Sequence, residues 1–431
     1  MTPSRPPAGL PADDPARSIR DAFGIRLLFD PGFLGVAVGL LLVVAVAFRG
    51  LQFVAWTSSI QWGYDFSAYW QAARYLLDGE PLYSAHQLAG PYAPQGVQGL
   101  YLYPPFLAVA VAPLAALFDD YRAAAWVWAA IGAAIVVAVV WSVARSEGLW
   151  GRRHRWYLLA AAFALPPVVG ELVMGNVHLV LLGLLAIAWL GHRRGGTAGD
   201  AVSGAAVGVA ALIKIFPGLI VLWFLLVGRP RAAGWAILVA AVLALATLPV
   251  TGLGPWLDYP VVLANLGAAT DMTDTLAPTV WLGDLVGFTV ARVAVTAVGL
   301  GLLVWSARRQ SAALSFGVAV MVSVLVAPAV YHHYLALTVL PFLLALAHRV
   351  ARPWLVATYL LLFGGDQPGL GAAAWIVNRL LPTLGALALL GGLVRSRGTP
   401  YERASADAAD RIRTARPRGG RTWTRDDLHD R

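Results

Sequence analysis

Apolar residues occur along this chain in long continuous runs rather than in an alternating pattern. The runs occupy residues 33–48, 105–118, 122–144, 156–171, 177–191, 201–213, 215–227, 232–250, 285–306, 311–328, 334–347, 352–364 and 373–394. Helices of about 20 apolar residues cross a hydrocarbon core, and they satisfy their own backbone hydrogen bonds in lipid. We therefore expect an all-α polytopic membrane protein with about 11–13 transmembrane or re-entrant helices.

Composition and charge support a membrane protein and argue against a nucleic-acid partner. Hydrophobic residues make up 59% of the 431 residues and charged residues only 13%, whereas soluble domains carry about 25% charged residues. The net charge of +9 comes from arginines in short loops and in the tail 395–431. That distribution is typical of contact with an anionic cytoplasmic leaflet, so the lipid bilayer is an expected partner and nucleic acid is not.

The arginines also predict which helix ends are cytoplasmic. The sets expected on that side are Arg152/Arg153/Arg155, Arg193/Arg194, Arg229/Arg231, Arg308/Arg309 and Arg349/Arg352. The loops 55–104 and 251–284 carry few arginines and are expected on the outer side of the plasma membrane. We expect a membrane domain at 31–395, between a disordered cytoplasmic N-terminus, 1–30, and a disordered basic cytoplasmic tail, 396–431.

This topology constrains three short apolar segments. Residues 105–118 become a re-entrant or partial span, while 201–213 and 215–227 become two short arms that meet near the outer side. They meet at Lys214-Ile215-Phe216-Pro217, where proline removes a backbone donor and breaks or bends the helix. Broken helices at membrane depth are tolerated where they line a cavity, so this break marks a candidate site.

An acidic residue among aromatic side chains follows the first span. Asp65 stands in Tyr64-Asp65-Phe66-Ser67-Ala68-Tyr69-Trp70. Apolar residues at helical spacing in Ser67–Asp78 predict an amphipathic helix lying on the membrane surface. An ionisable group so near membrane depth is a candidate functional residue, and a carboxylate there can act as general base toward a sugar hydroxyl. The structural alternative is that Asp65 caps the helix.

Lys214 is the second candidate. It is the only lysine among the 32 lysines and arginines, and it lies inside an apolar stretch. One interpretation is a lysine at a helix end whose ammonium reaches the membrane surface. The functional interpretation is a point charge that binds a phosphate oxygen at a helix break.

Adjacent histidines, His332 and His333, form the third candidate, as phosphate-binding residues at the outer end of a span. Side chains at neighbouring helical positions diverge, and the local sequence offers no acid beside them, so no metal site is expected. Weaker candidates for substrate contact are Asn176, His178 and the aromatic residues Tyr64, Tyr69 and Tyr103. The chain has no phosphate-binding loop or dinucleotide fingerprint, and no cofactor is expected.

Several motifs, taken in order, resemble those of a known family. They are Asp65-Phe66-x-x-Tyr69-x-x-Ala72, Leu77-x-Gly79, Leu82-Tyr83, Tyr103-Pro104-Pro105, Lys214-Ile215-Phe216-Pro217 and His332-His333-Tyr334. Over residues 30–395 the chain resembles the polyprenyl-phosphate-mannose-dependent mannosyltransferases of actinobacteria, glycosyltransferase family 87. Within that family the resemblance is strongest to the α-(1→2)-mannosyltransferases that extend phosphatidylinositol mannosides.

The resemblance implies the multispanning GT-C fold and an inverting transfer of mannose from polyprenyl-phosphate mannose to a glycolipid or lipoglycan acceptor, with an α-linked product, at the outer face of the plasma membrane. By position, Asp65 deprotonates the acceptor hydroxyl, and Lys214 with one of His332 and His333 holds the donor phosphate. The family's Gly-Gln-x-Asn element stands here as Gly175-Asn176-Val177-His178.

Three alternatives remain open at this point. The donor can be a polyprenyl-phosphate pentose such as arabinofuranose. From other functional classes, the protein can be a transporter or flippase for a lipid-linked sugar, or a scaffold in envelope synthesis. Transporters often carry paired broken helices in two matching halves, whereas this sequence shows one convincing break, at Lys214–Pro217.

Overall fold

The regular structure of this protein is helical. The computed structural model describes residues 31–90, 100–149, 151–268, 275–365 and 373–396, and within these ranges it contains helices and no strand. The helices are α3 (Pro31–Thr57), α4 (Tyr64–Asp78), α5 (Ala85–Ala89), α6 (Pro105–Leu117), α7 (Tyr121–Ser146), α8 (Arg152–Ala164), α9 (Pro166–Met174), α10 (His178–Arg194), α11 (Gly196–Ile213), η1 (Phe216–Gly218), α12 (Leu219–Leu226), α13 (Pro230–Thr251), α14 (Gly254–Ala268), α15 (Pro278–Val286), α16 (Phe288–Arg309), α17 (Ala312–Leu325), η2 (His332–Thr338), α18 (Val339–Ala347), α19 (Arg352–Leu361), η4 (Ile376–Leu380) and α20 (Leu381–Arg395). The predicted all-α polytopic class is confirmed. The expectations for residues 1–30 and for the tail fall outside the described residues, apart from Ser396.

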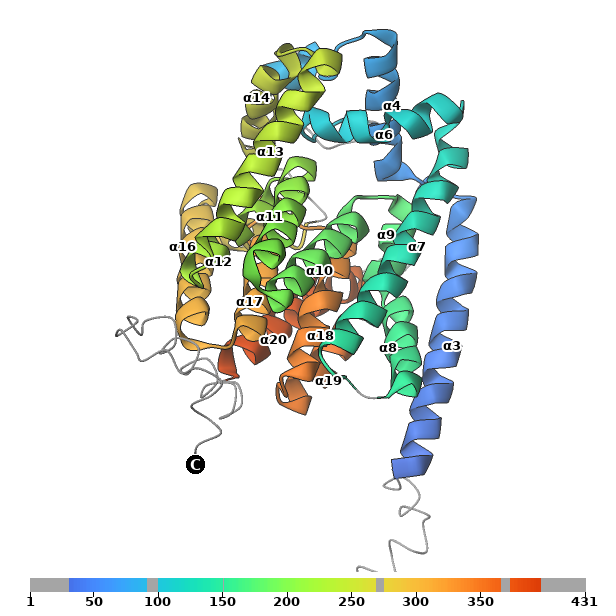
Figure 1. Cartoon of the computed structure of the whole chain (residues 1–431). Helices are drawn as coiled ribbons and strands as arrows, with labels where there is room; N and C mark the ends of the chain where they lie inside the picture. The colour runs from blue at the N-terminus through green and yellow to red at the C-terminus, as the bar shows by residue number, and fades with distance from the viewer. Residues whose placement is uncertain (1–30, 91–99, 150, 269–274, 366–372, 397–431) are drawn as a thin grey trace, which may run out of the picture.

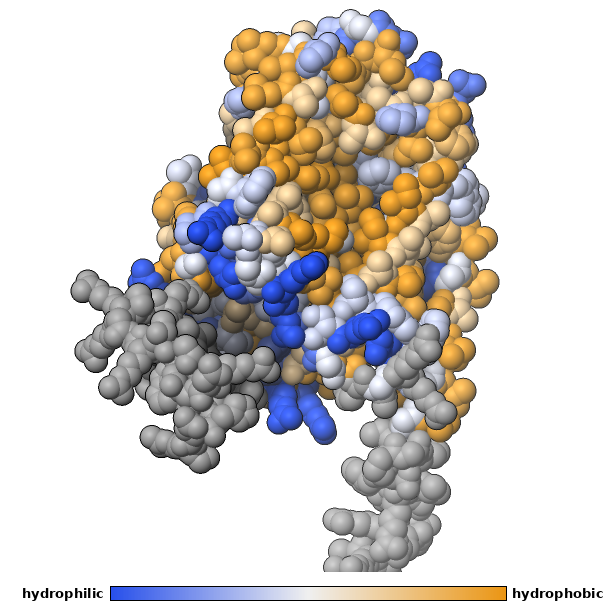
Figure 2. All heavy atoms as spheres, in the orientation of Figure 1, coloured by the Kyte–Doolittle hydropathy of each residue, from blue (hydrophilic) through white to orange (hydrophobic). Residues whose placement is uncertain are grey.

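Six helices in the described part of the chain are long and apolar enough to cross a membrane, and a seventh span results if the bent pair α8–α9 counts as one. Four shorter apolar helices join them, at Pro105–Leu117, Phe216–Leu226, Ala312–Leu325 and His332–Ala347. Long apolar side chains are exposed along α3, α13 and α16. Figure 2 shows this as a broad hydrophobic surface, which suits contact with lipid rather than water.

The arginine-rich helix ends lie together. Glu147, which follows α7, pairs with Arg193 at the end of α10 and with His348 after α18. Arg229, just before α13, pairs with Asp200 in the first turns of α11. These contacts place the predicted cytoplasmic ends at one end of the helix bundle, opposite the end where α4, α5, α6 and α14 gather (Figure 1).

That opposite end differs from the sequence-based expectation in two ways. The segment 251–284 is not simply a loop, because it contains α14 and the start of α15, and Asn265 of α14 donates to the backbone carbonyls of Gln87 and Leu88. The helix predicted at Ser67–Asp78 begins earlier, at Tyr64, and packs on α6 with one face buried instead of lying on the membrane surface. Figure 1 shows α4 running along the direction of the long helices, with the short helix α6 crossing it.

Helix breaks bring several chain segments to one level of the bundle. The chain bends by 63° between α8 and α9 at Leu165-Pro166. The predicted break at Lys214 is confirmed: α11 ends at Ile213, and Lys214 adopts an extended backbone before η1. The segment after α17 continues as η2, whose first residues are His332 and His333. Polar side chains at or next to these breaks, among them Lys214 and His333, lie close to one another.

Candidate functional site

Asp65 lies in the first turn of α4 but does not cap it. The N-cap is Gly63, and no side chain makes a capping hydrogen bond there, so the capping interpretation is wrong. Instead, Asp65 Oδ2 accepts a hydrogen bond from Asn176 Nδ2 at 2.9 Å and lies 3.3 Å from His333 Nε2. The Asp65 side chain is still 22% exposed. An accessible carboxylate held on one oxygen can receive a proton from a substrate.

Asn176 occupies a tight turn between α9 and α10. Gly175 ends α9 with φ of 69°, in the left-handed region that glycine tolerates best. A Cβ atom at Gly175 would stand 2.8 Å from Phe66 Cβ, so the turn also needs glycine for space. Asn176 Oδ1 accepts from the Val177 N–H at 2.7 Å, and Trp128 Nε1 donates to the Asn176 carbonyl. These contacts fix the amide that holds Asp65.

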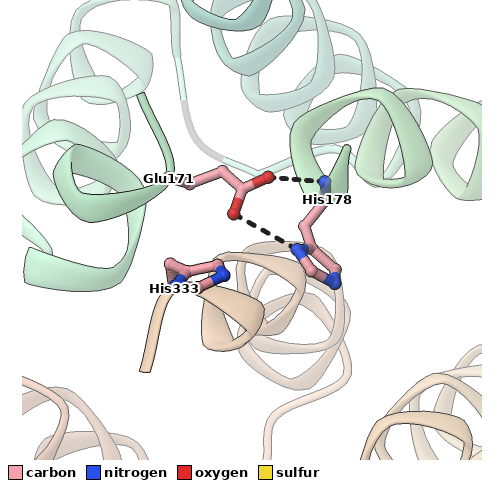
Figure 3. Close-up of side chains that lie close together, drawn as sticks. All are labelled: Glu171, His178 and His333. Atoms are coloured by element: carbon pink, nitrogen blue, oxygen red, sulfur yellow. Dashed lines mark hydrogen bonds and ion pairs between the residues drawn. The ribbon is translucent and has the colours of Figure 1, made fainter. Parts of the chain in front are cut away.

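Glu171 and His178 form a buried pair across the same turn (Figure 3). One Glu171 oxygen accepts from the His178 N–H at 2.5 Å, and the other lies 3.2 Å from His178 Nδ1. Where the Glu171 oxygen accepts a hydrogen bond from Nδ1–H, Nε2 of the neutral ring is left as an acceptor. That acceptor faces the Lys214 ammonium at 3.2 Å. The pair therefore holds Lys214 by a carboxylate–imidazole–ammonium chain.

Aromatic rings surround the Lys214 ammonium. Nζ lies 3.9 Å from the centre of the Tyr334 ring and 5.2 Å from that of Tyr103. The centre of the Phe216 ring lies 5.9 Å from Nζ, and this ring stacks on His178. Cation–π contacts stabilise a positive charge without neutralising it. Lys214 remains partly exposed, so its charge is available to an anionic substrate.

Tyr103 joins the two halves of this cluster. Its hydroxyl lies 3.4 Å from Asn176 Oδ1 and 3.5 Å from Lys214 Nζ, and it accepts a hydrogen bond from the Tyr69 hydroxyl at 2.9 Å. Burial raises the pKa of Tyr103, and the charge of Asp65 raises it further, so this phenol stays protonated. Within the described residues no ion pair joins Asp65 to Lys214. The partly exposed Tyr103 thus contacts both Lys214 and Asn176, the residue that holds Asp65, and the two charges do not pair with each other.

Two predicted site residues lie apart from this cluster. His332 points away from His333, and its Nε2 is 2.7 Å from the Gly364 carbonyl oxygen. The two side chains therefore diverge, as expected from their adjacency. Tyr64 is half-buried beside Asp65, and no hydrogen bond between described residues links its side chain to the cluster. The structure brings together the other seven: Asp65, Tyr69, Tyr103, Asn176, His178, Lys214 and His333.

The cluster also contains residues that sequence reasoning did not assign to the site. Glu171, to which the sequence assigned no role, pairs with His178 of the site. Ligand atoms of Glu171, His178 and His333 lie within 4.8 Å of one another. The local sequence offers no acid beside His333, but Glu171 and Asp65 approach it from other helices. A carboxylate and two imidazoles are a donor set that suits a transition-metal ion.

The sequence matches one family model over the middle of the chain. The model for glycosyltransferase family 87 matches residues 101–328, more than half of the chain. The chain belongs to glycosyltransferase family 87. The matched region includes Tyr103, Asn176, His178 and Lys214, whereas Asp65 and the two histidines lie outside it. None of the curated proteins compared with the chain matches it.

Membership of family 87 confirms the predicted resemblance at the level of the family. The protein is a polytopic membrane glycosyltransferase of the all-α class. A glycosyltransferase of this kind needs a base for the acceptor, a stabilised leaving group and a fixed alignment between them. The cluster at the helix breaks offers side chains suited to each of these tasks.

Proposed function

We propose that this glycosyltransferase transfers a mannosyl residue, with inversion, from polyprenyl-phosphate mannose to a glycolipid or lipoglycan hydroxyl. The product is an α-linked mannoside, with an α-(1→2) linkage as the expected position. The observation that carries the proposal is that Asp65, through Asn176, and Lys214 are both linked to the Tyr103 hydroxyl, while no ion pair between described residues joins them. An inverting displacement needs a base and a separate partner for the leaving group, and these two unpaired groups support that arrangement.

Asp65 is the proposed general base. It removes the proton from the acceptor hydroxyl while that oxygen attacks the anomeric carbon, and the bond from the anomeric carbon to the phosphate oxygen breaks. Asn176 and His333 hold one carboxylate oxygen at 2.9 and 3.3 Å, which leaves the other oxygen for the acceptor. The position of Asp65 in the first turn of α4 also places its negative charge at the positive end of the helix dipole.

Lys214 is the proposed partner of the donor phosphate. The leaving polyprenyl phosphate takes the electron pair of the broken bond, and a preorganised positive charge stabilises it. The Glu171–His178 pair orients the ammonium at 3.2 Å, and the Tyr103 hydroxyl beside it is a neutral donor for the same oxygens. His333 is the better placed of the two histidines, because His332 faces Gly364.

The outer face of the plasma membrane is the proposed side of the reaction. The site lies at the start of α10, which is 17 residues long and carries arginines at its other end, about 25 Å along the helix axis. Arginine-rich ends favour the cytoplasm. This arrangement supports a reaction near the outer boundary of the hydrocarbon core, where a lipid-borne phosphate can reach it.

Alternative donors and functions make different predictions. A pentose donor such as polyprenyl-phosphate arabinofuranose requires the same base and phosphate partner, so the donor must be tested directly. A transporter or flippase is less consistent with membership of a glycosyltransferase family, and a scaffold needs no intact Asp65. A transfer assay therefore distinguishes each alternative from the proposed mannosyl transfer.

The decisive experiment is an assay of the purified full-length protein with labelled polyprenyl-phosphate mannose and membrane acceptors. Wild type should transfer mannose, and Asp65→Asn should lose at least about 100-fold, since general-base catalysis contributes about 10²–10⁴-fold. Transfer of arabinofuranose but not mannose would identify the pentose donor. Equal transfer by both proteins would remove Asp65 from the reaction.

A further inference from the structure

A cavity separate from the reaction cluster lies between α3, α7, α8 and α9. Its volume is about 390 Å³, and its walls are apolar side chains such as Phe53, Ala133, Phe163 and Leu172. Volumes of this size are typical of small-ligand sites. Among the described residues that line it, Arg49 alone is charged.

Arg49 is a buried cation within α3, a mostly apolar helix that faces outward. Its side chain is only 5% exposed, although α3 itself has little buried surface. Nε donates to the Ala164 carbonyl at 3.4 Å, which lies at the bend between α8 and α9, and Nη1 donates to Gln52 Oε1 at 2.5 Å. The rings of Phe48 and Phe363 flank the guanidinium at 5.5 and 5.7 Å.

These neutral partners leave the charge of Arg49 uncompensated. Across the described part of the chain, no carboxylate lies within ion-pair distance of Arg49, and Nη2 has no hydrogen-bond acceptor. A buried charge without a counter-charge is costly, and arginines at membrane depth are normally paired. A guanidinium also presents a planar fork that matches phosphate oxygens. The missing partner is therefore an anion, with phosphate as the best geometric match.

The apolar walls of the cavity indicate that the bound anion also carries a hydrocarbon chain. An inorganic anion would leave the cavity between Phe53, Ala133 and Leu172 unfilled, whereas a hydrocarbon chain buries that surface. Gly50 of α3 and Ala130 of α7 both line the cavity and are exposed, so the cavity opens at the seam between these helices. In Figure 1, α3 stands at the edge of the bundle beside α7 and α8. The opening therefore faces the surrounding lipid.

The cavity is distinct from the place where the donor phosphate is proposed to react. Val169 and Leu172 of α9 line the cavity, whereas Glu171 of the same helix turns the other way, toward His178. Neither Lys214 nor His333 lines the cavity. A lipid-phosphate donor carries one phosphate, which Lys214 would hold, so Arg49 calls for a second lipid.

We propose that the cavity between α3, α7, α8 and α9 binds an anionic phospholipid of the surrounding bilayer. Its phosphate accepts hydrogen bonds from Arg49, and part of one acyl chain fills the apolar space beneath Phe53. The bound lipid contacts both the peripheral helix α3 and the bend between α8 and α9, and so stabilises their packing. The helix α9 carries Glu171. This binding site is independent of the identity of the transferred sugar.

The test is native mass spectrometry of the delipidated full-length protein with an equimolar mixture of phosphatidylglycerol and phosphatidylcholine. Wild type should retain one phosphatidylglycerol in preference to phosphatidylcholine. Arg49→Gln should weaken that binding about tenfold or more, since a charge-assisted hydrogen bond is worth about that factor. Ala133→Phe, which fills the cavity and keeps the arginine, should weaken binding of both lipids.

A matched control is Arg74→Gln. Arg74 also donates to a backbone carbonyl, that of Ala115, and also lies against an aromatic ring, that of Trp70, but it does not line the cavity. This variant should bind phosphatidylglycerol as wild type does. Equal retention of the two lipids by wild type, or unchanged binding in both Arg49→Gln and Ala133→Phe, would overturn the proposal. Retention of an added polyprenyl phosphate in place of phosphatidylglycerol would overturn it as well, and would assign the cavity to the donor.

Discussion

Asn176 holds Asp65 through a hydrogen bond of 2.9 Å from its amide to Oδ2, across 111 residues of sequence. The amide is itself fixed, because Oδ1 accepts from the Val177 N–H. An aspartate held in this way presents one oxygen in a defined direction. The contact therefore makes Asn176 a positioning residue for the proposed base.

Removing this contact should slow the reaction without unfolding the protein. We expect Asn176→Ala to lower kcat about 10–100-fold, since misalignment of a catalytic group costs factors of this size. KM for the donor should change little, because Lys214 and its partners remain in place. The measurement is steady-state transfer with the thermal unfolding midpoint recorded in parallel. A proportional loss of kcat and stability would show that Asn176 only supports the fold.

Lys214 gives the second prediction. Lys214→Met keeps the length and the apolar stem but removes the charge, so transfer should fall by about 10²–10³-fold, as when one preorganised stabilising group is lost. Lys214→Arg should recover only part of the activity, because the larger guanidinium does not fit between Tyr103 and Tyr334 in the same way. Donor binding measured without turnover provides the control. Full activity of Lys214→Met would remove the ammonium from the reaction.

The adjacent histidines provide an internal comparison. His333 lies 3.3 Å from Asp65, whereas His332 contacts the Gly364 carbonyl. His333→Ala should lower transfer about tenfold or more, since it removes a group that orients the base. His332→Ala should lower thermal stability and leave the rate per folded molecule near that of wild type. The reverse pattern would reassign the phosphate or base contact to His332.

The sequence predicted the kinds of residue in this site better than their arrangement. The lone lysine at a proline break and the aspartate after the first span are local signals, and the structure brings both to one cluster. The choice between His332 and His333 depends on the 3-10 geometry of η2 and on α4 and α9 packing beside it. No local pattern contains that information.

The errors have a common physical cause. The helix α4 has an amphipathic pattern, and such a pattern fits a membrane surface or a protein surface equally well. In the structure this helix packs against α6, and its buried Phe66 and Tyr69 lie against Trp128 of α7. The sequence likewise assigned no role to Glu171. Its pairing with His178 depends on the tight turn at Gly175, and the need for glycine there is visible only from the packing of Phe66 against the turn.

A test of metal dependence shows whether the buried histidines hold a metal ion or instead position Lys214 and Asp65. Glu171, His178 and His333 offer a donor set within 4.8 Å, but the Lys214 ammonium lies 3.2 Å from His178 Nε2 and repels a cation. We therefore expect transfer to continue in EDTA, with no stimulation by added Mn²⁺ or Zn²⁺. Loss of activity in EDTA and its recovery with one metal would show that these residues hold an ion.

Gly175 should be essential to both the fold and the site, and Gly79 provides its matched control. Both glycines end a helix in the left-handed region, with φ of 69° and 74°. At Gly79 no atom lies within 4 Å of an added Cβ, whereas at Gly175 the Phe66 Cβ is 2.8 Å away.

Gly79→Ala should therefore cost only the backbone strain, about 1–2 kcal/mol of unfolding free energy, and should leave transfer unchanged. Gly175→Ala adds a clash with Phe66, the residue that follows Asp65, so it should lower the unfolding midpoint further and also reduce transfer per folded molecule. Thermal unfolding and transfer rates of the two variants, measured in the same detergent, test this. Equal effects of the two substitutions would show that the contact between the turn and Phe66 does not position Asp65.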